Sequence, residues 1–522
     1  MTDQSDFTDS SGDPGSESVA TPISLPLTSR RNTFALLVGV VAVMLAAGLA
    51  IPIVVGHPMS ESATASGELS SNLSGNEATT TTATTTPVGP SEGTAAVGAD
   101  GGGTSSDGTS LGLGGNPSQP GVKLGTSDVG VTASTIKIGL LVPNSSTVGS
   151  TEDQKKVQEA EFHAYIDQVN AQGGINGRKI VTVTATYDVL DQGAGARNAC
   201  LKLTDDEKVF AVFNTTGFGP PGTMCLTREK QVPFLQGSGH PDEVYAQSNG
   251  LYSSTFDSQT RNYRNLVGTL ERLGVLKGKK IGVLGTEWIG LRRETEEGVV
   301  ATLKSLGYDP FVYWLSGDPA SSASQIPIAV QQMKANGVQV QFMTVDFVSG
   351  LNFVQQADAQ RYNPRYTGGD SWGWTTDYVT ANMPASFAGA ISVTAMRLYD
   401  ARVGVAEPAI DAACAKRFEE ATGIKLDRAN DPNALYVGSM FACGVVQRFI
   451  RASTAAGPNL TRRGLVDAIG ALGTVDVPFA GNPATYSPTK LDGANQYRPQ
   501  EWKANCKCWV PLVPQFTQGT YR

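Results

Sequence analysis

The chain has 522 residues, of which 40% are hydrophobic and 17% are charged, and its formal net charge is −8. This length accommodates several domains, and the hydrophobic share is sufficient for a globular core. Nucleic-acid binding depends on clustered Lys and Arg that contact phosphates, so a mildly acidic chain without a basic stripe excludes that class of function.

The first predicted element is an uncharged apolar run, residues 34–56. A helix over this run is about 35 Å long, enough to cross a hydrocarbon core of roughly 30 Å. Arg30 and Arg31 precede the run, and no Lys or Arg follows it until Lys123. The positive-inside rule therefore predicts a cytoplasmic tail at residues 1–33 and a single-pass cell-membrane protein with its remaining chain extracytoplasmic.

Residues 57–130 follow, rich in Ser, Thr, Gly, Ala and Pro. Between His57 and Pro120 there is no Lys, Arg, Phe, Trp or Tyr, and such a composition cannot bury a core. We predict a disordered linker with a root-mean-square span of roughly 45 Å, which keeps a binding domain near a membrane partner. The alternative is a cleaved signal peptide, with Ala63-Thr64-Ala65 as the cleavage site and a secreted product.

The globular composition begins at about residue 131. Ile136–Val142 is an apolar run typical of a buried parallel strand. The next pattern predicts a helix with Phe162, Ile166 and Val169 on one face, ending at Gly173-Gly174. Further strands are predicted at residues 181–187, 209–213 and 232–235.

The same order of elements then returns. Lys137-Ile-Gly-Leu-Leu is echoed by Lys280-Ile-Gly-Val-Leu, again followed by a predicted helix that ends at Gly307. Later strands are predicted at residues 311–314 and 338–345, and Tyr366 leads into Gly368-Gly369-Asp370. Alternating strands and helices predict an α/β fold of two doubly wound parallel-sheet lobes. Ligands of such sheets bind beyond the carboxyl ends of the strands.

All the cysteines follow the apolar run, which suits an oxidising compartment. They are Cys200, Cys225, Cys414, Cys443, Cys506 and Cys508. Sequence alone does not choose among the possible pairings. Short-range closure favours the pairs Cys200–Cys225 and Cys414–Cys443. Cys506 and Cys508 then remain as a tight pair. With 3 His in the chain and no CxxC spacing, we expect no metal site.

At this point the residues resemble a known family, over about residues 131–515. Ile136–Val142, Asn170–Ile180 with its Gly-Gly-Ile-Asn-Gly turn, and Ala199–Leu203 are similar to type I periplasmic binding proteins. The nearest subgroup is the Leu/Ile/Val-binding proteins of ABC importers. Glu501–Asn505 resembles the last strand of that family. The resemblance implies a hinged receptor of two lobes, without catalysis and without a cofactor.

The resemblance also implies where the chain passes between lobes. We expect crossings near Thr255, near Ser392 and within residues 475–495. The expected organisation is lobe 1 at residues 131–255, lobe 2 at 256–391, lobe 1 continued at 392–480, and a C-terminal segment at 481–522 that returns to lobe 2.

An amino-acid-like ligand is implied as well, with its carboxylate held by hydroxyl and backbone N–H groups of lobe 1 and its ammonium held by an acid of lobe 2. The loops after the third and fourth strands of lobe 1 offer Thr215, Thr216, Gly217, Ser238, Gly239 and His240. The matching strand ends of lobe 2 offer Trp288, Phe347 and Asp370. Asp370 is expected to pair with the ammonium, and the two aromatic residues are expected to pack on the ligand or make a cation–π contact.

Six of these residues have a simpler alternative. Thr215 and Thr216 are suited to capping a helix, and His240, next to Pro241, is suited to a solvated turn. Asp370 is suited to capping a helix near Trp374. The two aromatic residues of lobe 2 are suited to plain core packing.

We therefore expect a tethered solute receptor that delivers an amino acid or similar small polar metabolite to an ABC permease. The alternative is a ligand-sensing ectodomain that acts through a separate signalling partner. An enzyme is not expected. Gly217–Gly222 matches a dinucleotide-binding GxGxxG pattern, but its two prolines remove amide N–H groups that a pyrophosphate needs.

Overall fold

The structure of the protein is a computed structural model. It describes residues 114–117, 122–144, 152–188, 191, 193–288, 290–431 and 433–521. The predicted tail (1–33) and membrane helix (34–56) lie outside these ranges. Within the ranges, no helix is both long and apolar enough to cross a bilayer. All the ranges belong to one unit of the chain.

The first sheet contains five parallel strands in the order β2-β1-β3-β4-β5. They are β1 (Thr135–Pro143), β2 (Lys179–Tyr187), β3 (Ala211–Asn214), β4 (Phe234–Gln236) and β5 (Tyr252–Ser254). Helices α2 (Glu152–Ala171) and α13 (Leu435–Ala455) cover one face and α3 (Ala194–Leu201) covers the other, so both faces of each strand must be apolar. In β1, Leu140 joins the core beneath α2, and Leu141 joins a separate cluster beneath α3.

The second sheet repeats this plan. Its parallel part has the order β7-β6-β8-β9-β10, which is the order of the first sheet shifted along the chain. The strands are β6 (Ile281–Thr286), β7 (Phe311–Leu315), β8 (Val340–Thr344), β9 (Arg365–Gly368) and β10 (Ile391–Thr394). Three strands are added antiparallel at the β10 edge, namely β13 (Gln496–Lys503), β14 (Cys508–Pro511) and β15 (Thr517–Gln518). The repeated order confirms the prediction of two doubly wound parallel sheets.

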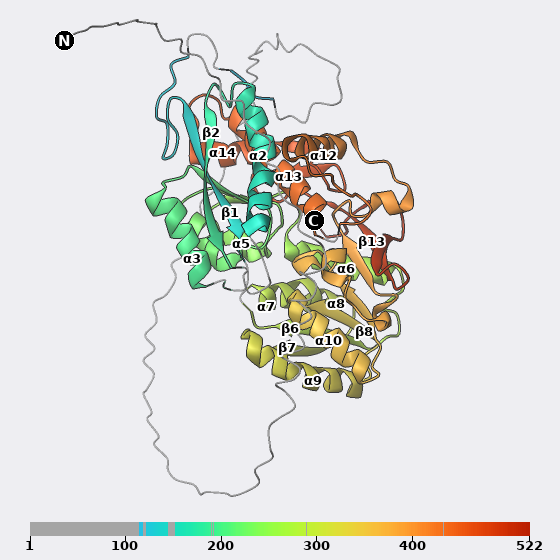
Figure 1. The fold of residues 1–522 in the computed structure, drawn as a ribbon. Helices are drawn as coiled ribbons and strands as arrows, with labels where there is room; N and C mark the ends of the chain where they lie inside the picture. Colours follow the sequence, from blue (N-terminus) through green and yellow to red (C-terminus); the bar gives the residue numbers. More distant parts are fainter. Residues whose placement is uncertain are drawn as a thin grey trace, which may run out of the picture. The chain divides into compact units, whose positions relative to one another are not determined.

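The helices alternate with the strands along the chain, and in Figure 1 β6, β7 and β8 lie among α7, α8, α9 and α10. The remaining α-helices and β-strands are α4 (Pro220–Met224), α5 (Asp242–Gln247), α6 (Gln259–Arg272), α7 (Leu291–Glu294), α8 (Ala301–Ser305), α9 (Pro319–Ala335), α10 (Phe347–Ala359), α11 (Asp377–Thr380), α12 (Ala409–Thr422), α14 (Arg462–Gly470), β11 (Gly473–Val475) and β12 (Ala484–Tyr486). Local chemistry sets their ends. The Asp318 side chain caps α9, Pro319 occupies its first turn, and Gly337 follows its end with φ of +66°.

In the described part of the chain, three segments join the two sheets. The first runs from β5 into α6, the second leaves β10, and the third leads from β12 into β13. The first and third lie side by side, because Ser254 N donates to Leu491 O (3.0 Å). The second is bonded to the chain ahead of β12, because Arg397 N donates to Phe479 O (2.8 Å). The connection between the sheets is therefore a bundle of hydrogen-bonded segments.

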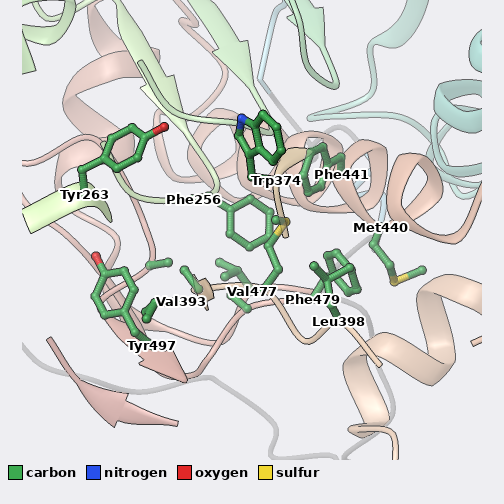
Figure 2. Packing of buried hydrophobic residues seen from close by; sticks show 14 of the residues in the cluster. Phe256, Tyr263, Trp374, Val393, Leu398, Met440, Phe441, Val477, Phe479 and Tyr497 are labelled. Carbon is green, nitrogen blue, oxygen red and sulfur yellow. The ribbon is translucent and has the colours of Figure 1, made fainter. Parts of the chain in front are cut away.

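An aromatic cluster packs around these segments (Figure 2). Phe256 of the first segment has its ring centroid 5.0 Å from that of Phe441 on α13 and 6.3 Å from that of Phe479. Trp374 and Tyr497, from the half of the chain that holds the second sheet, belong to the same buried core. The hydrophobic core is thus continuous between the two sheets at the place where the chain crosses.

Residues 114–117 are bonded to the turn that precedes β2, although the sequence predicted a linker up to residue 130. Asn116 N donates to Gly174 O (3.0 Å), and the Asn116 side chain accepts from Asn176 N (2.8 Å). The predicted end of the linker at residue 130 is therefore too late in the sequence for this segment. Composition does not show that a short polar segment forms hydrogen bonds with a distant turn.

The structure pairs every cysteine. The disulfides are Cys200–Cys225, Cys414–Cys443 and Cys506–Cys508. The first joins α3 to the segment after α4, the second joins α12 to α13, and the third closes the turn between β13 and β14. This is the pairing that short-range closure favoured.

Candidate functional site

Two loops of the first sheet meet at the carboxyl ends of β3 and β4. Gly237 N and Ser238 N both donate to Thr215 O, at 3.0 and 3.1 Å. The neighbouring parallel strands therefore bring the predicted segments Thr215–Gly217 and Ser238–His240 side by side, at the edge where doubly wound sheets bind ligands.

The hydroxyl side chains of these loops differ in exposure. Thr215 is buried, Ser238 is partly buried and Thr216 is exposed. Gly217 follows with φ of +88°, a left-handed conformation that favours glycine. A ligand at this edge would therefore meet the side chains of Thr216 and Ser238, whereas the Thr215 side chain belongs to the interior.

His240 is a buried residue of lobe 1. Its Nε2 lies 2.9 Å from Thr223 Oγ1, its ring packs on Tyr252 with centroids 4.8 Å apart, and it makes a further hydrogen bond with the Phe218 backbone. Burial lowers the pKa of His240 to about 3, so the ring is neutral. The structure thus places His240 beneath the loop, where it supports the loop and carries no charge toward a ligand.

Gly239 rests on the first crossing segment. A Cβ added at Gly239 would lie 1.9 Å from Asp257 O, so the close approach of the two backbones requires glycine. The Asp257 carboxylate accepts from Tyr497 OH (2.6 Å), and burial raises the pKa of Asp257 to about 7. A predicted ligand loop and the connection between the sheets are therefore in direct contact.

The aromatic candidates of lobe 2 are both partly buried. Trp288 follows β6, and its backbone N–H donates to Thr286 Oγ1 (3.3 Å). Phe347 is the first residue of α10, where the Asp346 side chain caps the helix. Both residues therefore lie at the carboxyl ends of neighbouring strands, β6 and β8.

Asp370 follows β9 and is held by the protein. Its Oδ1 accepts from Thr375 Oγ1 (2.8 Å), and its Oδ2 accepts from Asn262 Nδ2 (3.1 Å) and Ala395 N (2.8 Å). The Thr394 hydroxyl supplies a further hydrogen bond. Burial nevertheless raises the pKa of Asp370. These donors come from the segment after β9 itself, from α6 and from the end of β10, so the carboxylate ties the β9 loop to the other two.

Sequence reasoning missed a buried acid beside this loop, Glu294 of α7. The side chain is fully buried, and its Oε1 accepts from Ser371 Oγ (2.6 Å). Its Oε2 has no hydrogen-bond partner. Burial raises the pKa of Glu294 to about 8, so the group is a neutral acid near pH 7. A single Glu on an amphipathic segment gives no signal of burial, because its neighbours in space come from other elements.

Glu294→Gln should flatten the dependence of stability on pH. The folded-state pKa of Glu294 is raised from 4.5 to about 8, so the stability that its proton contributes is fully present below about pH 4.5 and is lost as the pH rises through about 8. Between pH 5.5 and 7.5 the free energy of unfolding of the wild-type protein should fall by up to about 2 kcal/mol. The Gln side chain does not titrate, so the free energy of unfolding of the variant should not show this fall. Urea unfolding at both pH values measures the difference, and parallel pH profiles for the two proteins would contradict it.

The strand-end loops of the two sheets touch each other. Glu243 of α5 pairs with Arg293 of α7 (2.6 Å). Pro220 of α4 packs on Gly290, where an added Cβ would lie 2.7 Å from Pro220 Cγ. All four residues follow carboxyl ends of strands, so the edges predicted to bind ligand approach one another. Among the described residues, no cluster of His, Cys, Asp and Glu is arranged to hold a metal ion.

Comparison with solved structures finds the same fold at low identity. A fatty acid ABC transporter substrate-binding protein from Thermomonospora curvata is 18% identical with a TM-score of 0.58, over 78% of this chain and 97% of that one. A solute-binding protein from R. palustris in complex with 4-hydroxybenzoate is 16% identical with a TM-score of 0.57, over 74% and 97%. A leucine-binding protein from Thermotoga maritima is 13% identical with a TM-score of 0.55, over 73% and 98%.

Two doubly wound sheets of the same strand order, joined by crossing segments and touching through their strand-end loops, define the type I periplasmic binding fold. Residues 135–507 match the family model of the periplasmic binding proteins. The chain belongs to this family, which confirms the resemblance seen in its sequence. A search of curated proteins finds no match.

Proposed function

We propose that the protein is a membrane-tethered, extracytoplasmic solute-binding protein that captures an amino acid or a similar small polar metabolite and delivers it to an ABC importer. Binding proceeds by hinge closure. A ligand that contacts both lobes binds the closed state more tightly than the open state, and so it shifts the population toward closure. The importer then distinguishes the closed, loaded protein from the open one.

The contact between the strand-end loops of the two sheets is the observation that carries this proposal. Pro220 meets Gly290 and Glu243 meets Arg293 beside the predicted ligand residues. Among the similar proteins of known structure are two ABC transporter proteins, one described for a fatty acid and one in complex with 4-hydroxybenzoate, and a leucine-binding protein. In our proposal Thr216, Ser238, Trp288 and Phe347 contact the ligand, while Thr215, Gly217, Gly239 and His240 shape the loops.

The lobe boundaries and the cellular location are part of the proposal. We propose lobe boundaries at residues 255, 391 and 480. The strand memberships of β5 and β10 support the first two, and the third crossing segment lies between β12 and β13. Three disulfides suit an oxidising compartment outside the cytoplasm. A helix over residues 34–56 would hold the binding domain at the cell membrane.

Hydrogen exchange of the full chain tests closure. With a metabolite found by thermal-shift screening, exchange should slow together in peptides covering residues 215–222 and 237–241 of lobe 1 and residues 287–291 of lobe 2. The two lobes respond together because the ligand and the loop contacts of the closed state protect both. At a ligand concentration of 100 times Kd, the stabilisation should be about 2.7 kcal/mol.

The last turn of helix α9, which ends at Ala335, serves as the internal control. It lies beside the amino end of β8, opposite the strand-end loops, so its exchange should not change. Protection confined to one lobe would show that the ligand does not bridge the lobes, and the closure mechanism would then be wrong.

A further inference from the structure

The carboxylate that would meet an ammonium group is already occupied by the protein. Asp370 stands at the position where the resemblance predicts that partner, yet it accepts hydrogen bonds from Thr375, Asn262, Ala395 N and the Thr394 hydroxyl. A carboxylate has about four acceptor sites. Since four donors are present and they come from three parts of the fold, the acceptor capacity of Asp370 is taken up within lobe 2.

The other acids that follow β6, β7 and β8 are engaged as well in the described part of the chain. Glu287 pairs with Arg292 (2.6 Å). Asp318 caps α9 and Asp346 caps α10. Glu294 is fully buried beneath the β9 loop and bonded to Ser371. Among the described residues at the carboxyl ends of these strands, Trp288 and Phe347 are partly exposed, and each of these acids already has a partner within the protein.

Lobe 1 offers the opposite chemistry. Thr216 is exposed and Ser238 is partly buried, so both hydroxyls lie within reach of a ligand at the carboxyl ends of β3 and β4. Hydroxyl donors suit a carboxylate. His240 beneath them is neutral and buried. The lobe 1 edge is thus equipped for an anionic group, and the lobe 2 edge for an apolar body.

We propose that the ligand is a carboxylic acid with an apolar or aromatic body and without an α-ammonium group. Its carboxylate binds the loops after β3 and β4, and its body packs between Trp288 and Phe347. This inference rests on the proposed function and narrows its ligand class from amino acids and their analogues to the analogues that lack the amine.

Pairs of compounds that differ only in the α-amino group provide the test. Isothermal titration calorimetry of the full chain compares leucine with 4-methylpentanoate, phenylalanine with 3-phenylpropanoate, and tyrosine with 3-(4-hydroxyphenyl)propanoate. The expected result is that the acid without the amine binds at least tenfold more tightly than its amino-acid partner in at least one pair. Tighter binding of any amino acid than of its partner would overturn the inference and leave the proposed function standing.

If neither member of any pair binds, the inference is also overturned. A thermal-shift screen of neutral and cationic metabolites then decides the proposed function separately. A stabilising compound from that screen would preserve solute binding with another ligand class, and the absence of one would count against solute binding itself.

Asp370→Asn tests the role of the carboxylate directly. The variant keeps the side-chain shape and removes the charge, so it should change the Kd of the best acid less than about threefold. Thr375→Val, which removes one of the donors to Asp370, is the control for disturbance of the β9 loop. A loss of 100-fold or more in the Asn variant, with Thr375→Val unaffected, would show that Asp370 faces a cationic group and would overturn the inference.

Discussion

Replacing Asp492 with Ala should lower the free energy of unfolding by about 3–5 kcal/mol. Asp492 is buried at the third crossing segment, where it forms ion pairs with Arg261 and Lys490 and accepts from Ser258 N (2.8 Å). Removal of the carboxylate leaves the Arg261 charge buried at the junction of the lobes without its main partner. Uncompensated buried charge is among the costliest single defects in a folded protein.

Urea unfolding at pH 7 measures the loss, and Asp467→Ala is the matched control. Asp467 pairs with Arg463 (2.9 Å) on α14, but both side chains are largely exposed, so the control should cost less than about 1 kcal/mol. Burial acts against ionisation of Asp492, but the charges of Arg261 and Lys490 hold its pKa below 3.8. The difference between wild type and variant should therefore shrink as the pH falls below about that value. Equal effects in the buried and exposed pairs would contradict the prediction.

Gly239→Ala should cost about 3 kcal/mol, the upper part of the range for an overpacked site. The new Cβ would lie 1.9 Å from Asp257 O, and a backbone carbonyl cannot rotate away as a side chain can. Either the loop after β4 or the first crossing segment must shift. The variant should therefore also lose affinity for ligand, because the loop carries Ser238 at the proposed carboxylate site.

Gly125→Ala is the control for the general effect of replacing glycine. A Cβ at Gly125 meets no atom within 4 Å, and its φ lies outside the left-handed region, so the variant should be within about 0.5 kcal/mol of wild type. Urea unfolding measures the free energy of unfolding of both variants, and calorimetry measures their Kd for the same ligand. If the Gly239→Ala protein had wild-type stability and affinity, the loop after β4 could shift away from the first crossing segment without cost, and the prediction would be wrong.

The strands and their repetition could be predicted from sequence because buried parallel strands leave continuous apolar runs. Ile136–Val142 and the Lys280-Ile-Gly-Val-Leu echo are of this kind, and both became central strands. β5 was missed because Tyr252–Ser254 is too short and too polar to show a period. The antiparallel β14, which pairs with the preceding β13, was missed because Cys508–Pro511 is too short to show the alternation of a strand.

The candidate site was predictable only as a set of strand ends. Topology alone brings Thr215 next to Ser238, since adjacent parallel strands end together. The state of each side chain depends on residues far away in sequence. Asp370 is held by Asn262, 108 positions earlier, and His240 is buried by an aromatic ring from β5. Contacts between residues so far apart in the sequence produce no local sequence pattern. The orientation and the charge of these side chains could therefore not be predicted from the sequence.

The bonding of residues 114–117 to the turn before β2 sets where a mechanical load enters the folded body. That turn lies at the amino end of an edge strand, whereas the proposed ligand loops lie at the carboxyl ends of the same sheet. Any pull transmitted along the preceding chain is therefore taken up on the far side of the sheet from the ligand. In the membrane-tethered receptor that we propose, a force along the chain ahead of residue 114 would therefore reach the fold at the end of the sheet opposite the ligand loops, and would not act on them directly.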